Sequence, residues 1–417
     1  MIPSMPPLLT LFLALTVKQD QAPLRAGCAE DSTVVRTLAA GTQLEMRYVL
    51  AGDSSPCYKV KATIGAWSYE GYLSADAVEG LDAFDKTRRQ AQAVSVGEAL
   101  SAVRSGLAEL SRSAAKAAPG PTVSRVAVAQ AQDLIEANQP SKALELLEPE
   151  LKKRRDPGLL ALAGVAAWRA DEAKHALEYW KESLELAPNP QLENLYKRVE
   201  REQANDQSGE KLFGVRVVLR YDPGTVPIET ARKMLSVVDA TYASVSSQLG
   251  CTTDERIVTI IQSRDAYMKA TNGAEWSGGQ YDGRIRIPVQ AGQTMNAEAE
   301  RTLAHETTHA CLSLLGQWPA WVQEGFAQKL SGDRLQPAIQ ARLKEMAKQG
   351  QLPRLEDLKQ DWSRLDNDHA QLAYALALAA ADALFENYHS DGIRNLMRSP
   401  DRLPAISSEL DKLLGLN

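Results

Sequence analysis

The chain has 417 residues, of which 44% are hydrophobic and 24% are charged, and its net charge is −6. This length predicts about two to three domains, and the composition is that of folded soluble domains, which excludes wholesale disorder and a polytopic membrane protein. The acidic balance offers phosphates no broad basic field, so we expect neither nucleic acid nor an acidic lipid surface as a partner.

The amino terminus carries one long apolar run, from Leu8 to Val17. It has the length of a secretory signal core and is too short to span a bilayer. We therefore predict a signal segment over residues 1–26 and an exported protein of the periplasm or cell envelope, without a stable membrane span. Because residues 1–7 contain no Lys or Arg, a buried amino-terminal strand or helix is the alternative.

The four cysteines show no C-x-x-C spacing, which argues against a thiolate zinc site or a redox dithiol. Cys28 and Cys57 share a short segment, so we expect them to form a disulfide in an oxidising compartment. Two unpaired thiols are the alternative. No pairing is predicted for Cys251 and Cys311.

Residues 27–80 contain short runs of alternating apolar and polar positions separated by Gly, Asp and Pro, which predicts a small all-β unit. The runs YKV at Tyr58 and GYL at Gly71 resemble the ends of bacterial Src-homology-3-like barrels. That resemblance implies a module that binds cell-wall or other peptides. The alternative is that its aromatic side chains only fill the barrel core: Tyr48, Tyr58, Trp67 and Tyr72.

Residues 81–205 follow helical spacing, and over about 124–190 the run ALELL recurs as ALEYW after 33 residues. Such a period is typical of paired-helix repeats. The segments resemble tetratricopeptide repeats, in which a small residue, here Gly164, allows the close approach of a large one, here Trp180. We expect a docking surface for a protein partner, and we interpret the charged stretch 197–211 as a helix end and linker.

Residues 212–417 begin with a strand, a helix and a second strand, and a Gly-rich turn then leads into a strand over Arg284–Val289. The pattern predicts a mixed α+β layer. Because Pro288 suits an edge position and extended peptides add to exposed sheet edges, we expect this strand to be the edge that aligns a peptide beside the next helix.

That next helix, predicted over Leu303–Leu315, contains the run HETTH from His305 to His309. Positions i and i+4 lie on one helix face, so both imidazoles can bind one metal ion. Glu306 lies at the edge of that face, where its carboxylate can take a proton from a water activated by the metal. The run predicts a zinc site, and two core histidines beside an unrelated glutamate are the alternative.

A catalytic zinc needs a third protein ligand, and no third His follows at metzincin spacing. The chain continues instead as WPAWVQEGFA, which predicts a second helix bearing Glu324. With HETTH, this order resembles the peptidase MA-like domain of gluzincins over about residues 213–400. The resemblance implies Zn2+ on His305, His309 and Glu324, Glu306 as general base, and a peptide or protein substrate.

Gln328 stands four residues after Glu324, where thermolysin-like enzymes carry an Asp that orients a ligand histidine. The partner of the ligand histidines is therefore left open. Gluzincins also supply a Tyr or His that stabilises the transition state, and Tyr374 resembles that tyrosine, with His369 as a second candidate. The alternative for both is core packing on an Ala/Leu-rich helix.

Together these patterns predict a multidomain protein: a small all-β barrel, an all-α tetratricopeptide-like region, and an α+β zincin-like domain. The predicted function is zinc-dependent peptide hydrolysis. A non-catalytic zinc-bearing scaffold, which binds protein or cell-wall partners through its repeats and barrel, is the alternative.

Overall fold

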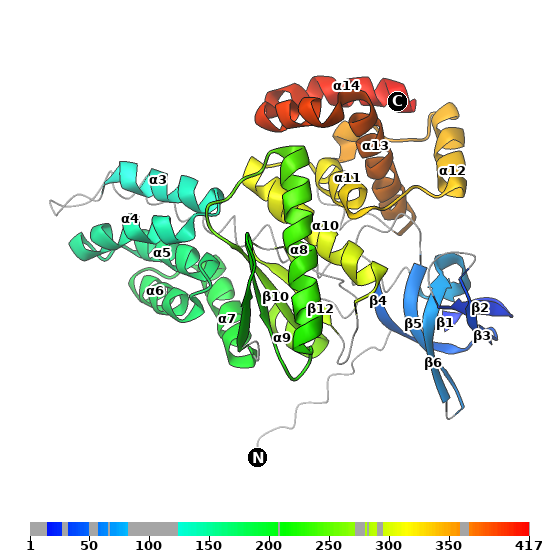
Figure 1. The fold of residues 1–417 in the computed structure, drawn as a ribbon, viewed down its shortest axis with the longest axis horizontal. Helices are drawn as coiled ribbons and strands as arrows, with labels where there is room; N and C mark the ends of the chain where they lie inside the picture. The colour runs from blue at the N-terminus through cyan, green and yellow to red at the C-terminus, as the bar shows by residue number, and fades with distance from the viewer. Residues whose placement is uncertain are drawn as a thin grey trace, which may run out of the picture.

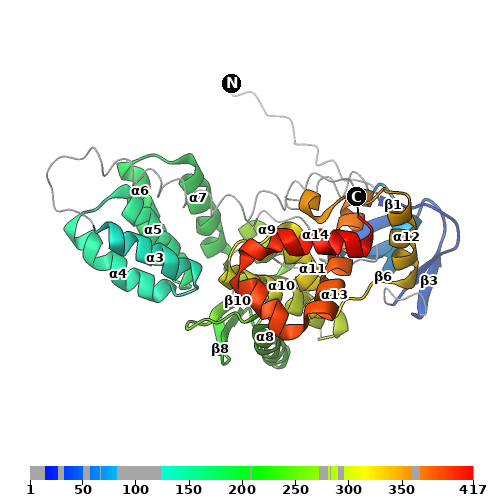
Figure 2. The ribbon, with the colours of Figure 1, turned by 90° about the horizontal axis from the view of Figure 1, so that it is seen from above.

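The computed structural model of the chain describes residues 15–26, 32–49, 57–65, 67–81, 124–206, 209–271, 280–281, 283–289, 295–358 and 367–416. These residues form a curled antiparallel sheet, a stack of helices, and a mixed sheet with helices packed on it. The first two parts lie at opposite ends of the molecule, with the third between them (Figure 1 and Figure 2). No helix in the described ranges is long and apolar enough to cross a membrane.

The amino-terminal part is a seven-stranded antiparallel sheet that curls around a core of its own. Its strands are β1 (Leu15–Val17), β2 (Ala22–Arg25), β3 (Val34–Leu38), β4 (Gln43–Val49), β5 (Cys57–Ile64), β6 (Trp67–Ser74) and β7 (Val78–Glu79). They lie in the order β3-β2-β6-β5-β4-β1-β7. At Gly71, a Cβ atom would lie 2.6 Å from the carbonyl oxygen of Arg25, so the close approach of β6 and β2 requires glycine.

Two of these strands precede the predicted start of the barrel at residue 27. β1 pairs with β4 and β7, and Leu15 and Val17 are buried in the core. The end of the apolar run, Leu15–Val17, is therefore a buried strand of the curled sheet. Residues 1–14, which make up the rest of the predicted signal segment, lie outside the described residues. Cys28 and its predicted disulfide lie outside them as well.

The aromatic residues of this part divide into core and surface. Tyr58 and Tyr72 are buried, whereas Trp67 beside the β5–β6 turn is 73% exposed. The side chain of Tyr48 is not among those described.

The central stretch forms five consecutive helices, α3 (Arg125–Glu136), α4 (Pro140–Lys153), α5 (Pro157–Arg169), α6 (Ala173–Leu186) and α7 (Pro190–Asn205). A Cβ atom at Gly164 would lie 2.2 Å from the indole nitrogen of Trp180, which donates a hydrogen bond to the Ala161 carbonyl at 3.0 Å. The small-to-large contact expected from the 33-residue period is therefore present between α5 and α6. The helices expected between residues 82 and 123 lie outside the described ranges.

The third part begins with a five-stranded sheet in the order β11-β12-β10-β9-β8. β9, β10 and β12 run parallel, and β8 and β11 are antiparallel to their neighbours. The elements in chain order are β8 (Glu210–Phe213), β9 (Val217–Tyr221), α8 (Ile228–Leu249), β10 (Ile257–Ser263), α9 (Arg264–Thr271), β11 (Gln280–Tyr281), β12 (Ile285–Val289) and α10 (Ala297–Leu315).

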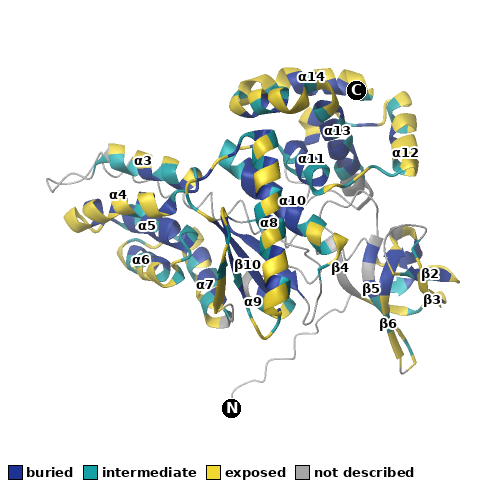
Figure 3. Cartoon of the chain, viewed as in Figure 1, coloured by how far each residue is buried: buried dark blue, intermediate teal, exposed yellow. Residues whose placement is uncertain are grey.

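Helices cover both faces of this sheet. Ile285, Ile287 and Val289 share one core with α8 and α10, while α9 contacts the sheet and packs against α7. In Figure 3 β10 and much of α10 are buried, whereas α8 has one exposed stripe; β8, at the edge of the sheet, is mostly exposed. The chain ends with helices that pack beyond α10: α11 (Ala320–Ser331), α12 (Pro337–Lys348), η2 (Leu355–Leu358), α13 (Asn367–Arg398), η4 (Pro400–Arg402) and α14 (Leu403–Leu414).

The predicted edge strand is not the outermost one. β11 pairs with the first residues of β12, with Gln280 opposite Arg286 and Tyr281 opposite Ile285, and all five residues of β12 are buried. The prediction that residues 284–289 form the edge is therefore wrong at the start of the strand, because β11 pairs with Ile285 and Arg286. The edge beside α10 is β11.

The stretch 197–211 is also more than a linker. It includes the last turns of α7 and the first residues of β8, and Glu202 within it is 6% exposed. A hydrogen bond also joins the turn between α3 and α4 to the loop before β10: Asn138 Nδ2 donates to Thr253 Oγ1 at 3.1 Å. The helices and the sheet therefore share an extensive interface.

Buried charges lie at the centre of this interface. Arg284 and Arg286 have no exposed surface, and both donate to the Glu202 carboxylate at 3.0 to 3.1 Å. Arg220 on β9 is paired with Asp171, from the α5–α6 turn. Arginine is almost never fully buried unless it is paired, so the sheet face requires the acids of the helical part.

We predict that a fragment of residues 209–417 is less stable than a fragment of residues 124–417. The shorter fragment lacks Glu202 and the helices that bury Arg284 and Arg286, so both arginines lose the ion pairs and packing contacts that they have in the longer fragment. Urea unfolding followed by circular dichroism measures the difference. Equal midpoints and slopes for the two fragments would contradict the prediction.

Candidate metal centre

Helix α10 presents the HETTH run, as predicted, and begins earlier than predicted. Asn296 caps its first turn by accepting from the Ala299 amide at 2.8 Å, and Gly316 with φ 128° ends it. Thr307 and Thr308 have no exposed surface, and their hydroxyls donate to carbonyls one turn back at 2.6 and 2.9 Å. The two central residues of the motif are therefore satisfied within the helix, and the histidines face outward from it.

Helix α11 places Glu324 opposite these histidines. Trp321 and Phe326 anchor it in the core, with at most 1% exposed surface. At Gly325 a Cβ atom would lie 2.3 Å from the Ala377 carbonyl oxygen of α13. Only glycine allows this approach, so the depth of α11, and with it the position of Glu324, is set by α13.

Three predicted ligands converge. His305 Nε2 and His309 Nε2 lie 3.1 Å apart, and the Glu324 carboxylate oxygens lie 3.4 Å and 3.7 Å from them. A tetrahedral zinc with bonds of about 2.0 to 2.1 Å requires donor atoms about 3.3 Å apart. Within the described residues this is the one group of three or more metal-ligating side chains that could hold a metal ion. Its spacing and donor set fit a site with three protein ligands.

The histidine tautomers are set differently at the two ligands. His309 Nδ1 lies 3.2 Å from Gln323 Oε1, an acceptor, so the proton belongs on Nδ1 and the Nε2 lone pair faces the site. His305 Nδ1 is buried, and no hydrogen bond reaches it from the described part of the chain. Gln323 is a site residue that the sequence analysis missed, and its place beside Glu324 on the same helix was the available signal.

Gln328 does not take the place of the aspartate of thermolysin-like enzymes. Its amide nitrogen donates to the Glu324 carbonyl at 3.2 Å and to the Tyr374 carbonyl at 3.1 Å. The side chain has no exposed surface and joins α11 to α13. Its role here is to hold the helix that carries Glu324.

The two glutamates of the site have opposite pKa shifts. Burial raises the pKa of Glu306 to about 7, with the positive charge of His309 lowering it and the negative charge of Glu324 raising it further. Burial also raises the pKa of Glu324, but the charges of His309 and His305 outweigh burial and lower it overall. Glu324 is therefore an anion suited to a ligand, and Glu306 exchanges a proton near neutral pH.

A further carboxylate, Asp333, is close enough to His305 to interact with it electrostatically. Burial raises the pKa of Asp333 to about 6, against the lowering effect of His305 and Arg301. Arg301 Nε is 3.8 Å from Asp333 Oδ1 and precedes His305 by one turn of α10. Asp333 follows α11 and was not identified from the sequence.

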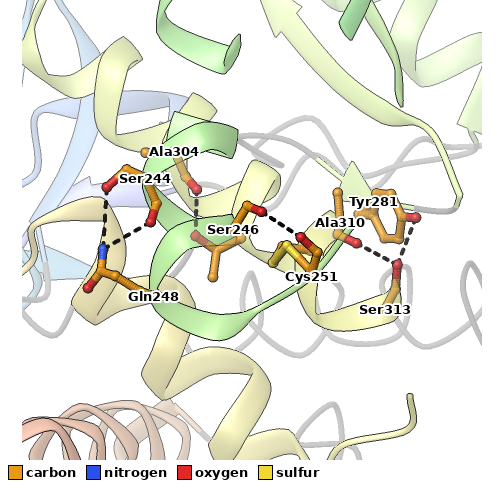
Figure 4. The surroundings of a disulfide bond; sticks show 10 residues. Ser244, Ser246, Gln248, Cys251, Tyr281, Ala304, Ala310 and Ser313 are labelled. Carbon is orange, nitrogen blue, oxygen red and sulfur yellow. Dashed lines mark hydrogen bonds between the residues drawn. A yellow bond between two sulfur atoms is a disulfide. The ribbon is translucent and has the colours of Figure 1, made fainter. Parts of the chain in front are cut away.

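A disulfide tethers the metal helix. Cys311, two residues after His309, is bonded to Cys251, and neither has exposed surface. Figure 4 shows the Ser246 hydroxyl of α8 donating to the Cys251 carbonyl at 2.5 Å. No pairing of these cysteines was predicted, because their separation of 60 residues gives no local signal.

The two candidates for transition-state stabilisation, Tyr374 and His369, lie on α13. Tyr374 is half-buried, and its carbonyl accepts from Gln328 as described above. The side chain of His369 is not among those described. Tyr388 donates to Glu409 at 2.5 Å, and His389 has φ 49° at a kink in the helix.

A scan against models of known protein families gives no match to this chain, and a search of curated proteins gives none either.

We predict that replacing both Cys251 and Cys311 by alanine lowers the free energy of unfolding by about 4 kcal/mol, because the bond closes a loop of 60 residues. Urea unfolding of the variant and of oxidised wild type measures this change. Reduced wild type is the matched control and should unfold like the variant. A midpoint equal to that of oxidised wild type would show that the bond contributes nothing.

We predict that Glu306→Gln stabilises the metal-free protein above pH 7 by about 1 to 3 kcal/mol. The folded state holds the Glu306 proton up to about pH 7, whereas the unfolded chain releases it near 4.5, so wild-type stability declines as pH rises through this window. Glutamine has no such proton. Unfolding with a chelator at pH 5 and pH 8 tests this, and a difference between the proteins that is the same at both pH values would contradict it.

Proposed function

We propose that residues 212–417 form a zincin-like, gluzincin-type peptidase domain that hydrolyses peptide bonds with zinc. The observation that carries the proposal is the convergence of His305, His309 and Glu324 at spacings close to those of a tetrahedral zinc site. The ligands come from two packed helices, in the order HETTH and then EG, as the family resemblance implies.

The chemistry divides between the metal and the chain. Zinc bound by the three ligands supplies a Lewis acid that polarises the scissile carbonyl and acidifies a water. Glu306, adjacent to His305, then accepts the proton of that water and donates it to the leaving amine.

Tyr374 remains the proposed donor to the developing oxyanion. Its helix packs against α11, and its carbonyl is bonded to Gln328, one turn from Glu324. A substrate peptide in extended form would add to β11, the sheet edge whose Tyr281 hydroxyl is hydrogen-bonded to Ser313 on the metal helix at 2.8 Å.

The accessory parts and the compartment belong to the same proposal. The helical repeats would dock a protein partner, and the Src-homology-3-like sheet would bind a cell-wall or other peptide. The disulfide between Cys251 and Cys311 supports an exported protein, because such bonds persist in oxidising compartments such as the periplasm.

We predict that Glu306→Gln retains zinc and stops peptide cleavage, whereas Glu324→Ala loses both. The first variant keeps the shape of the side chain but cannot accept a proton, and the second removes one of three ligands. Zinc stoichiometry and hydrolysis of a peptide library measure the two effects. Glu300→Gln, an exposed position on the same helix, is the matched control and should behave as wild type.

The outcomes separate the alternatives. Full zinc in Glu324→Ala would show that the third ligand is another residue. A wild type that binds zinc and cleaves no member of a broad library would favour the zinc-bearing scaffold.

A further inference from the structure

The helical part holds β12, the strand that pairs with β11, where we propose that a substrate adds to the sheet. Arg284 and Arg286 flank Ile285 on β12 and point to the sheet face opposite the metal helix, where Glu202 of α7 accepts from both. All four donor-acceptor distances are 3.0 to 3.1 Å. One carboxylate therefore fixes two side chains of one strand, and side chains with no exposed surface cannot reach a substrate.

Other residues of the helices reinforce this contact. The Trp168 ring lies under the Arg284 guanidinium, 4.3 Å from ring centre to Cζ. Burial raises the pKa of Asp171, but Arg220, Lys211 and Arg284 outweigh it and keep the carboxylate ionised. At Gly283, in the turn between β11 and β12, a Cβ atom would lie 2.9 Å from Nε of Arg169, and φ is 100°. The turn between β11 and β12 therefore packs closely against Arg169 at the end of α5.

The fixed strand leads directly to the metal helix. The backbone of Arg286 pairs with Gln280 of β11, and Ile285 pairs with Tyr281. The Tyr281 hydroxyl is hydrogen-bonded to Ser313, one turn beyond His309 on α10 (Figure 4). The path from Glu202 to the helix of the metal ligands thus consists of one buried ion pair, one strand pairing and one hydrogen bond.

We propose that Glu202 is a positioning residue for the peptidase reaction: from the helical part, it holds the β11–β12 hairpin in the place where an extended substrate pairs with the edge. The inference rests on the proposed function and adds to it a substrate class, peptides long enough to pair with β11. The repeats are then part of the substrate-binding apparatus, and shorter substrates do not depend on them.

The test compares Glu202→Gln with wild type in the full chain loaded with zinc. Two substrates are used, a long peptide that can reach β11 and a short reporter that ends near the scissile bond. We expect KM for the long peptide to rise about tenfold to a hundredfold, since small displacements of a binding element have effects of this size. Turnover of the short reporter and zinc content stay at wild-type values.

A readout independent of activity is hydrogen exchange. The amides that pair β11 with β12 should exchange faster in Glu202→Gln than in wild type. Glu193→Gln on the same helix is the matched control, because it removes an exposed pair with Lys197 at 2.6 Å and should change neither measurement. If Glu202→Gln does not fold, Glu202→Asp is measured in its place. Aspartate keeps the charge on a shorter side chain, so KM for the long peptide and the rate of amide exchange should change in the same direction.

The outcomes distinguish two failures. A wild type that cleaves neither substrate overturns the proposed function and this inference with it. A wild type that cleaves both, with unchanged KM and exchange in the Glu202 variants, overturns this inference alone. Equal losses on the long and short substrates also overturn it, because they indicate only a structural role.

Discussion

The buried charges between the helical part and the sheet constrain the whole of the carboxy-terminal structure. Two arginines without exposed surface are tolerable inside a protein only when they are paired with acids. Glu202 accepts hydrogen bonds from both, and Asp171 lies 3.8 Å from Arg284. Apolar residues could have filled the same face of β12 without needing a partner. Arginines make the sheet dependent on one particular helix in one particular orientation.

The metal centre shows a similar reliance on helix placement. Helix α10 carries two of the three candidate ligands and α11 carries one, so the site depends on how the two helices pack. Gly325 allows α11 to pack closely against the Ala377 carbonyl of α13. The partners of the ligand histidines are unlike those of thermolysin-like enzymes. The side-chain oxygen of Gln323, a neutral amide, accepts a hydrogen bond from His309 Nδ1, where a carboxylate would make the imidazole more basic.

Sequence reasoning succeeded where the signal is local. The i, i+4 spacing of HETTH requires only a helix, and the spacing of Gly164 and Trp180 requires only two adjacent helices. It failed where the structure depends on contacts between segments that are far apart in the sequence. The period-2 pattern of residues 284–289 predicts a strand but does not show that α7 would cover its arginines, and an apolar run at the chain start fits a signal core and a barrel strand equally well. The pairing of Cys251 with Cys311 likewise depends on a fold that brings α8 to α10.

That covalent bond has a consequence for the integrity of the molecule. Residues 251 to 311 form a closed ring that contains β10, β11 and β12 together with His305 and His309. A single backbone cut anywhere within a ring opens it without releasing a fragment. If a protease cuts the chain between β10 and α10, the two pieces stay joined through the disulfide, and the cut is visible only after reduction.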